Sequence, residues 1–133
     1  MPYQFDFDST QRILRCRLEG VIADEELREY YRDAERYVVR TDPLAGILDM
    51  SGVTSLDVSP NTIRDLAKSP PAMPNPARPR IVIATSPPVF GVVRMFELQG
   101  QDTRPNLHVV RSEKEAFAIL GIEKAKFEAI QTK

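Results

Sequence analysis

Two apolar runs in which hydrophobic residues do not alternate with polar ones constrain this chain most. They span residues 44–50 and 80–85, and a weaker run of the same kind spans 107–110. A strand that is buried on both faces has this pattern, whereas a half-buried strand alternates. Helical patterns separate the three runs, so we expect parallel βαβ units with right-handed crossovers. The sequence therefore predicts an α/β fold.

The start of the chain shows the opposite pattern, a strict alternation. The apolar positions at every second residue are Tyr3, Phe5 and Phe7, followed by Leu14, Cys16 and Leu18. Two half-buried strands joined by a turn at 8–11 explain this alternation, and they predict an antiparallel hairpin. Cys16 falls on the inward side, where we expect a small buried hydrophobe.

Four segments show the periodicity of amphipathic helices. The first begins at Asp24, a predicted N-cap, and its tyrosines fall on the stripe expected to face the core. The other three begin after serines, which favour N-cap positions: Ser59, Ser86 and Ser112. Proline follows Ser59 and Ser86, which strengthens both predicted helix starts.

The predicted order is ββαβαβαβα, with helices packed on a mixed, mostly parallel sheet of about five strands. One or two further helical turns are expected over 123–131, where only Phe127 and Ile130 provide anchors. A length of 133 residues suits one domain over 1–133, because two cores of half this size would be too small to be stable.

Charge and residue counts exclude several classes of function. With 18 Lys and Arg against 19 Asp and Glu, the net charge is −1, so nothing favours a nucleic-acid backbone. A single cysteine, Cys16, and a single histidine, His108, exclude a structural zinc site, and no cofactor is indicated. No segment approaches about 18 consecutive apolar residues and no signal sequence is visible, so we expect a cytoplasmic protein without a membrane span.

The segment 45–68, AGILDMSGVTSLDVSPNTIRDLAK, joins an apolar strand to a helix start through what we expect to be an exposed Ser/Gly/Thr/Asp loop. In many open α/β domains such a turn carries the functional site. Within it, ILDMSGVTSLDVS resembles the central segment of the STAS domain of bacterial anti-sigma factor antagonists. There an apolar strand ends in Leu-Asp and continues through Ser-Gly-Val-Thr to an Asp-Ser-Ser-Gly-like turn.

Further stretches resemble the small stand-alone SpoIIAA-like (STAS/SEC14-like) bacterial proteins. They are residues 80–84, GVVRMFE at 91–97, and 106–110 before the helix that contains 115–117. The likeness covers nearly the whole chain, and it implies the SpoIIAA-like (STAS) fold for the single domain.

The resemblance also implies a regulatory role controlled at one serine. In the antagonists the serine of the turn is phosphorylated, and the matching residue here is Ser59. A phosphate at a helix N-terminus meets free N–H groups and adds charge to a partner-binding surface. The chain departs from the motif because Val58 replaces the first serine and Pro60 replaces the glycine, which removes one backbone donor. The alternative is that Ser59 is an ordinary N-cap.

The Ser59, Ser86 and Ser112 helix starts all follow carboxyl ends of predicted parallel strands, so we expect them to share one edge of the sheet as a candidate ligand site. The candidate binding residues are Asp49, Asp57, Ser59, Ser86, Phe90, Gly91, Arg94, Met95 and Glu97, with Arg111 nearby. Since Cys16 and His108 lie within predicted strands, no nucleophile and base pair is expected and no catalytic residue is assigned.

Three classes of function follow. The first hypothesis is a non-enzymatic STAS-like domain that binds a protein partner. The alternative is a SEC14-like carrier or sensor of a small apolar or amphipathic ligand, held between the sheet and the helix at 91–98 under the Pro-rich loop at 69–79. The weakest is an enzyme that uses Asp49 or Asp57.

The helix predicted from 87 to 100, PPVFGVVRMFELQG, is apolar on nearly all sides. Such a helix is either deeply buried or covers a contact with another chain. We therefore expect its outer side to meet a second copy in a homodimer, or else the Pro-rich loop of the same chain.

Overall fold

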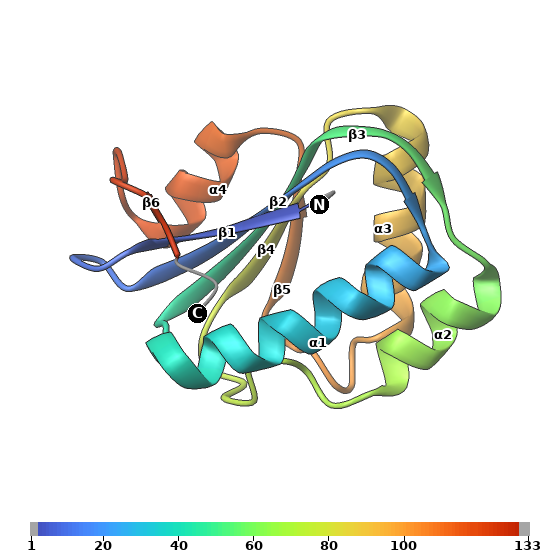
Figure 1. Cartoon of the computed structure of the whole chain (residues 1–133), viewed down its shortest axis with the longest axis horizontal. Helices are drawn as coiled ribbons and strands as arrows, with labels where there is room; N and C mark the ends of the chain where they lie inside the picture. Colours follow the sequence, from blue (N-terminus) through green and yellow to red (C-terminus); the bar gives the residue numbers. More distant parts are fainter. Residues whose placement is uncertain (1–2, 131–133) are drawn as a thin grey trace.

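The computed structural model describes residues 3–130 and contains a six-stranded sheet and four helices (Figure 1). The strands are β1 (Tyr3–Asp8), β2 (Ile13–Ala23), β3 (Ala45–Asp57), β4 (Arg80–Ile83), β5 (Leu107–Val110) and β6 (Glu128–Ala129). The helices are α1 (Asp24–Thr41), α2 (Pro60–Lys68), α3 (Pro87–Gln99) and α4 (Glu113–Leu120). The predicted order ββαβαβαβα is confirmed, and the short β6 follows it.

The strands lie in the order β5-β4-β3-β2-β1-β6. Strands β2, β3, β4 and β5 run parallel to one another, whereas β1 is antiparallel to both β2 and β6. In the hairpin Phe5 pairs with Cys16, as the alternation requires if both are to face the core. The mixed, mostly parallel sheet is therefore confirmed.

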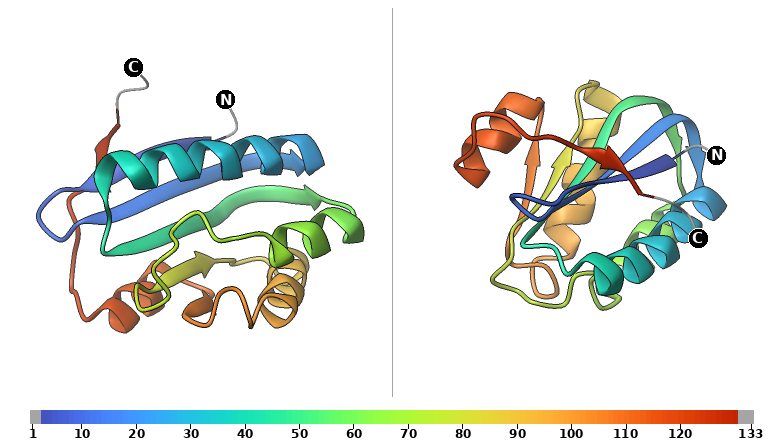
Figure 2. Two further views of the ribbon diagram at one scale, coloured as in Figure 1. Left: turned by 90° about the horizontal axis from the view of Figure 1, so that it is seen from below. Right: turned by 60° about the vertical axis from the view of Figure 1, so that its left-hand side comes forward.

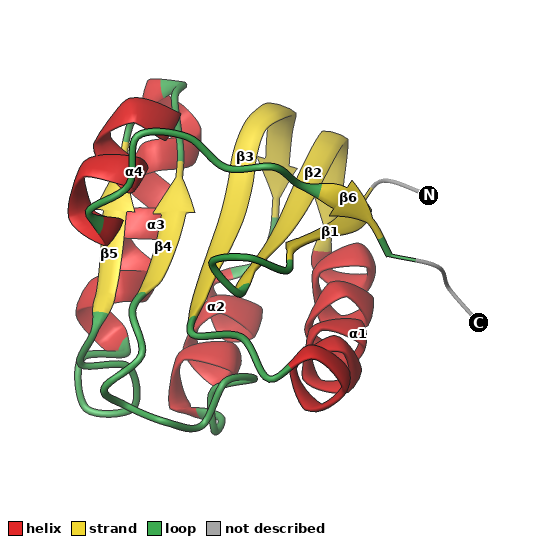
Figure 3. Cartoon of the chain, turned by 90° about the vertical axis from the view of Figure 1, so that its left-hand side faces the viewer, coloured by secondary structure: helices red, strands yellow, loops and turns green. Residues whose placement is uncertain are grey.

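Helices cover both faces of the sheet. Figure 3 shows α4 on one face and α1, α2 and α3 on the other. The larger core cluster lies on the three-helix side and contains Leu18 and Ile22, which are completely buried. The smaller cluster joins Ile47 and Ile81 to Ala116 of α4. Strands β3 and β4 are thus buried on both faces, which explains their non-alternating sequences.

The tyrosines of α1 pack mainly as predicted. The ring of Tyr37 lies 4.4 Å from that of Phe5 between centroids, and Tyr30 stacks on the same Phe5 at 6.0 Å. Burial raises the pKa of Tyr30. Tyr31 differs, because its hydroxyl donates to the carbonyl oxygen of Pro70 in the Pro-rich loop.

The prediction of an exposed loop over 51–57 is wrong, because these residues belong to β3. Strand β3 continues to Asp57 because β2 also continues to Ala23 and pairs with it up to that point. The register shifts along this stretch, and Gly20 adopts a left-handed φ of 78°, which bends the pair. The polar residues of 51–57 stand on exposed surface, so a long strand has the composition of a loop.

The prediction of a helix over 123–131 is wrong for residues 123–130, and residue 131 lies outside the described residues. The buried carboxylate of Asp8 accepts a hydrogen bond from the N–H of Lys126 at 2.8 Å. The N–H of Ile130 donates to the carbonyl oxygen of Phe5 at 3.0 Å. These bonds hold the chain along β1, where β6 pairs with Asp6 and Phe7.

Candidate functional site at the end of the β2–β3 pair

Ser59 lies beyond the main edge of the sheet, the line at which the pairing of β3, β4 and β5 ends at Asp49, Ile83 and Val110. Strand β4 pairs with β3 only as far as Asp49, whereas β3 runs eight residues further to Asp57. Ser86 and Ser112 follow the short strands β4 and β5 and stay near the main edge. The prediction that the three helix starts share one edge is therefore wrong for Ser59, because the long β2–β3 pair carries it toward the start of α1 (Figure 1).

The N-cap role predicted for Ser59 is confirmed. Its Oγ accepts a hydrogen bond from the N–H of Thr62 at 3.2 Å and lies 3.0 Å from the Thr62 hydroxyl oxygen. Ser112 caps α4 in the same way, with its Oγ accepting from the N–H of Glu115 at 3.2 Å. Ser86 occupies the N-cap position of α3 without a hydrogen bond from its side chain.

The predicted N-cap role of Asp24 is wrong, and its carboxylate instead holds Ser59. Ala23 occupies the N-cap position of α1, and its N–H donates to the Glu26 carboxylate at 2.9 Å. Asp24 Oδ1 accepts from the backbone N–H of Ser59 at 2.8 Å. That bond, with help from the Ser59 hydroxyl and Arg28, lowers the pKa of Asp24. The first turn of α1 is thereby joined to the start of α2.

The surface around Ser59 is polar and accessible. Ser59 itself is half-buried, while Asp57, Pro60 and Asn61 are exposed. The guanidinium of Arg28 reaches across from α1 and donates to the Thr62 hydroxyl at 2.9 Å. This end of the molecule consequently offers hydrogen-bonding groups and both signs of charge.

The other predicted site residues do not gather around Ser59. Asp49 accepts from the N–H of Ser51 at 2.9 Å, a local turn contact. Phe90, near the start of α3, lies under the guanidinium of Arg111, 4.2 Å from its ring centroid. Since Asp49 and Asp57 stand eight residues apart on one strand, they form no carboxylate pair.

On α3, the Arg94 side chain forms an ion pair with Glu97 one turn later. Gly91 is exposed, and Met95 and Leu98 expose 41% and 54% of their surface. The apolar outer side of α3 thus remains open in the single chain. Its contact with a second copy stays a prediction.

A cavity of about 170 Å³ lies between the sheet, α1, α3 and the Pro-rich loop. Its walls are mostly apolar, and they include Tyr31, Met73, Arg80, Val93, Phe96 and Arg104. The loop, residues 69–79, crosses the three-helix face of the sheet beside α1 (Figure 2, left). Pro71, Ala72 and Met73 of the loop line the cavity, and a role of the loop as a lid over a ligand stays a prediction.

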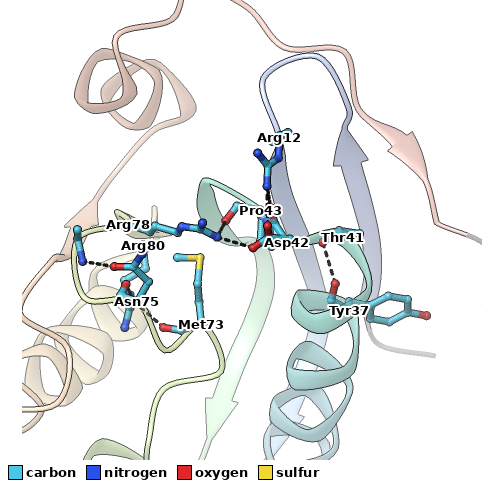
Figure 4. A network of polar contacts seen from close by, with 10 residues as sticks. Arg12, Tyr37, Thr41, Asp42, Pro43, Met73, Asn75, Arg78 and Arg80 are labelled. Atoms are coloured by element: carbon cyan, nitrogen blue, oxygen red, sulfur yellow. Dashed lines mark hydrogen bonds and ion pairs between the residues drawn. The ribbon is translucent and has the colours of Figure 1, made fainter.

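Two arginines anchor the Pro-rich loop at its return to the sheet (Figure 4). Arg78 donates to the Asp42 carboxylate at 2.7 Å and to the carbonyl oxygen of Pro43 at 2.8 Å. Arg80 donates through Nη2 to the carbonyl oxygens of Met73 at 2.7 Å and Asn75 at 3.0 Å. The loop is therefore fixed at one end by charged side chains.

Within residues 3–130, no group of three or more His, Cys, Asp or Glu side chains is placed to hold a metal ion. A search of the same residues finds no helix long and apolar enough to cross a membrane.

Comparison with known proteins identifies the fold. No protein-family model matches the chain, and no curated protein matches it by sequence. Among solved structures, the unphosphorylated form of the anti-sigma factor antagonist SpoIIAA matches with a TM-score of 0.60 and 14% identity, over 92% of this chain and 99% of SpoIIAA. The phosphorylated form of the Bacillus cell fate determinant SpoIIAA matches with a TM-score of 0.55 and 13% identity, over 89% of this chain and 98% of that chain. The chain has the SpoIIAA fold.

The likeness to SpoIIAA confirms the resemblance to STAS domains at the level of fold. It extends over nearly the whole of both chains, as the sequence motifs predicted. Sequence reasoning missed two residues in this SpoIIAA-like frame, Arg80 and Arg104. Arg80 is the first residue of the apolar strand β4, and Arg104 lies between α3 and β5, so neither position signals that its guanidinium lines a cavity.

Proposed function

We propose that this protein is a non-enzymatic regulatory domain that binds a protein partner through the end of the β2–β3 pair and the start of α2. The observation that carries the proposal is the position of Ser59 at this end, bound to Asp24 and flanked by exposed polar residues. Further support comes from SpoIIAA, an anti-sigma factor antagonist that has been solved in unphosphorylated and phosphorylated forms.

Phosphorylation of Ser59 would act through charge. A phosphoserine carries about −1.5 to −2 charges at neutral pH. Its oxygens would lie beside the Asp24 carboxylate that now accepts the Ser59 N–H, and like charges in contact repel. Pro60 offers no N–H to compensate, and Arg28, which donates to the neighbouring Thr62 hydroxyl, could turn toward the phosphate. The modification would thus loosen the start of α2 from α1 and change the partner surface.

The test combines detection of the modification with binding. Mass spectrometry of the protein purified from its native cells reads the occupancy of Ser59 by phosphate. Immobilised wild type and Ser59→Asp are then compared for the partner that they retain from the same cells. We expect phosphate on Ser59 and a partner whose capture differs several-fold between the two proteins.

Ser112→Asp is the matched control. Ser112 caps α4 with the same 3.2 Å bond that Ser59 makes to α2, but α4 lies on the other face of the sheet (Figure 3). Ser112→Asp introduces the same charge at a helix N-terminus and should leave capture of the partner unchanged. Equal capture by all three proteins, together with unmodified Ser59, would refute the switch.

The second candidate function is a carrier or sensor of a small apolar or amphipathic ligand. The observation that favours it is the cavity of about 170 Å³ beneath the Pro-rich loop. Denaturing extraction of purified protein followed by mass spectrometry tests it. A small molecule in stoichiometric amount would support the carrier, and a clean extract from protein purified under mild conditions would count against it.

A further inference from the structure

We propose that the cavity beneath the Pro-rich loop binds the carboxylate of a small apolar acid, with Arg80 as the residue that binds the anion. This inference rests on the second candidate function, the carrier or sensor. It adds the chemical class of the ligand and the residue that selects it.

The size of the cavity limits the apolar part of the ligand. A dry engineered cavity of about 150 Å³ binds benzene, and the cavity here has a volume of about 170 Å³. Its lining includes Val93 and Phe96 from α3 and Met73 from the loop, all apolar. A single ring or a short alkyl chain fits this space, whereas a long-chain lipid would not be enclosed.

Arg80 supplies unused hydrogen-bond donors at the cavity wall. Its Nη2 is bound to the carbonyl oxygens of Met73 and Asn75. Its Nε and Nη1 are buried and have no partner within residues 3–130. Buried polar atoms are nearly always satisfied, because an unpaired donor loses its hydration without compensation. An oxygen of a bound ligand would remove this deficit once the Arg80 guanidinium turns one of these donors toward the cavity that the residue lines.

The charge around Arg80 selects an anion. Arg104 also lines the cavity, and its guanidinium donates to Tyr31 and, at 3.0 Å, to the carbonyl oxygen of Ala67. Neither Arg80 nor Arg104 forms an ion pair with any carboxylate in the described part of the chain. Burial and the nearby charge of Arg104 lower the pKa of Arg80. Two uncompensated positive charges beside apolar walls favour a negative headgroup on an apolar body.

The test compares three probes that share one ring and differ in charge. Benzoate, benzyl alcohol and benzylamine are titrated into the full chain and followed by chemical shifts of the methyl groups that line the cavity. Benzoate is expected to bind about tenfold or more tightly than benzyl alcohol, the usual effect of a charge-assisted hydrogen bond. Benzylamine is expected not to bind. This series tests the inference on the wild-type protein, without relying on any variant.

Arg80→Gln should abolish the preference for benzoate over benzyl alcohol. Arg78→Gln is the matched control, because Arg78 anchors the same loop through Asp42 and Pro43 but does not line the cavity. It should leave the preference intact. Benzyl alcohol and benzoate binding equally to wild type would overturn the role of Arg80 while leaving the carrier function standing. Binding of none of the probes would overturn both.

Discussion

The carboxylate of Asp24 accepts a hydrogen bond from the backbone N–H of Ser59 at 2.8 Å, although the two residues are 35 positions apart in the chain. The bond joins the start of α1 to the start of α2. The bond closes the end of the β2–β3 pair. It places the predicted switch residue, Ser59, against a negative charge, which makes this end sensitive to any added charge.

The Asp24 bond predicts a pH dependence of stability. Because the Ser59 N–H lowers the pKa of Asp24 in the folded protein, the bond stabilises the protein above the ordinary aspartate pKa of about 3.9 and is lost as the pH falls through the lower folded value. The urea midpoint of Asp24→Asn should therefore lie below that of wild type at pH 7, and the gap should close at lower pH. Asp57→Asn, at an exposed position, should show no gap at either pH.

Asp8 should hold the C-terminal segment. Its buried carboxylate accepts from the N–H groups of Thr10 and Gln11 at 2.9 Å each and from Lys126 at 2.8 Å. Although burial raises the pKa of Asp8, these bonds outweigh it and lower the pKa. Asp8→Ala is expected to destabilise the protein by about 1–3 kcal/mol and to speed hydrogen exchange of the Lys126 amide. Unchanged exchange would contradict this role.

Alternation along β2 predicts a large effect and a small effect at two positions that are close together on the strand. Leu18 is completely buried, and Val21 exposes 61% of its surface. Leu18→Ala should lower the free energy of unfolding by about 2–5 kcal/mol, as for other large core truncations. Val21→Ala should change it by no more than about 0.5 kcal/mol. Denaturant unfolding of both variants measures the difference, and similar losses would contradict the inward placement of Leu18 and the outward placement of Val21.

Cys16 should be inert in the native protein. It exposes 2% of its surface, and burial together with the charge of Asp6 raises the pKa of its thiol. Because the thiolate is the reactive form, labelling by a thiol reagent at pH 8 should proceed only as fast as the protein unfolds. Rapid labelling without denaturant would show that the strand opens locally.

Periodicity was sufficient to predict most of the fold. Alternation in the hairpin and continuous apolar runs in β3 and β4 follow directly from burial on one face or on two, and Ser-Pro and Ser-x-x-Glu starts place the helices. The end of β3 was not predicted, because Thr54 and Ser55 are exposed and polar and therefore have the composition of a loop. Strand β6 was not predicted, because a strand of two residues is too short to show an alternation of polar and apolar positions.

The candidate site was predictable only in part. The N-cap role of Ser59 follows from the local sequence, but its bond to Asp24 depends on how far the β2–β3 pair extends. Arg80, at the start of β4, and Arg104, in the connection before β5, come together only in the folded chain. No local pattern distinguishes such arginines from surface ones, since their burial is a property of the loop that covers them.

Site-specific photocrosslinking tests the proposed partner surface most directly. A photoreactive amino acid is placed at Asn61, exposed beside Ser59, or at Ala118, exposed on α4 on the opposite face of the sheet. After irradiation in the native cells, we predict a defined crosslinked protein from position 61 that is absent from position 118 and changes in yield when Ser59→Asp is added. Crosslinks of equal yield from both positions, or none from position 61, would contradict a protein-binding role for the Ser59 end.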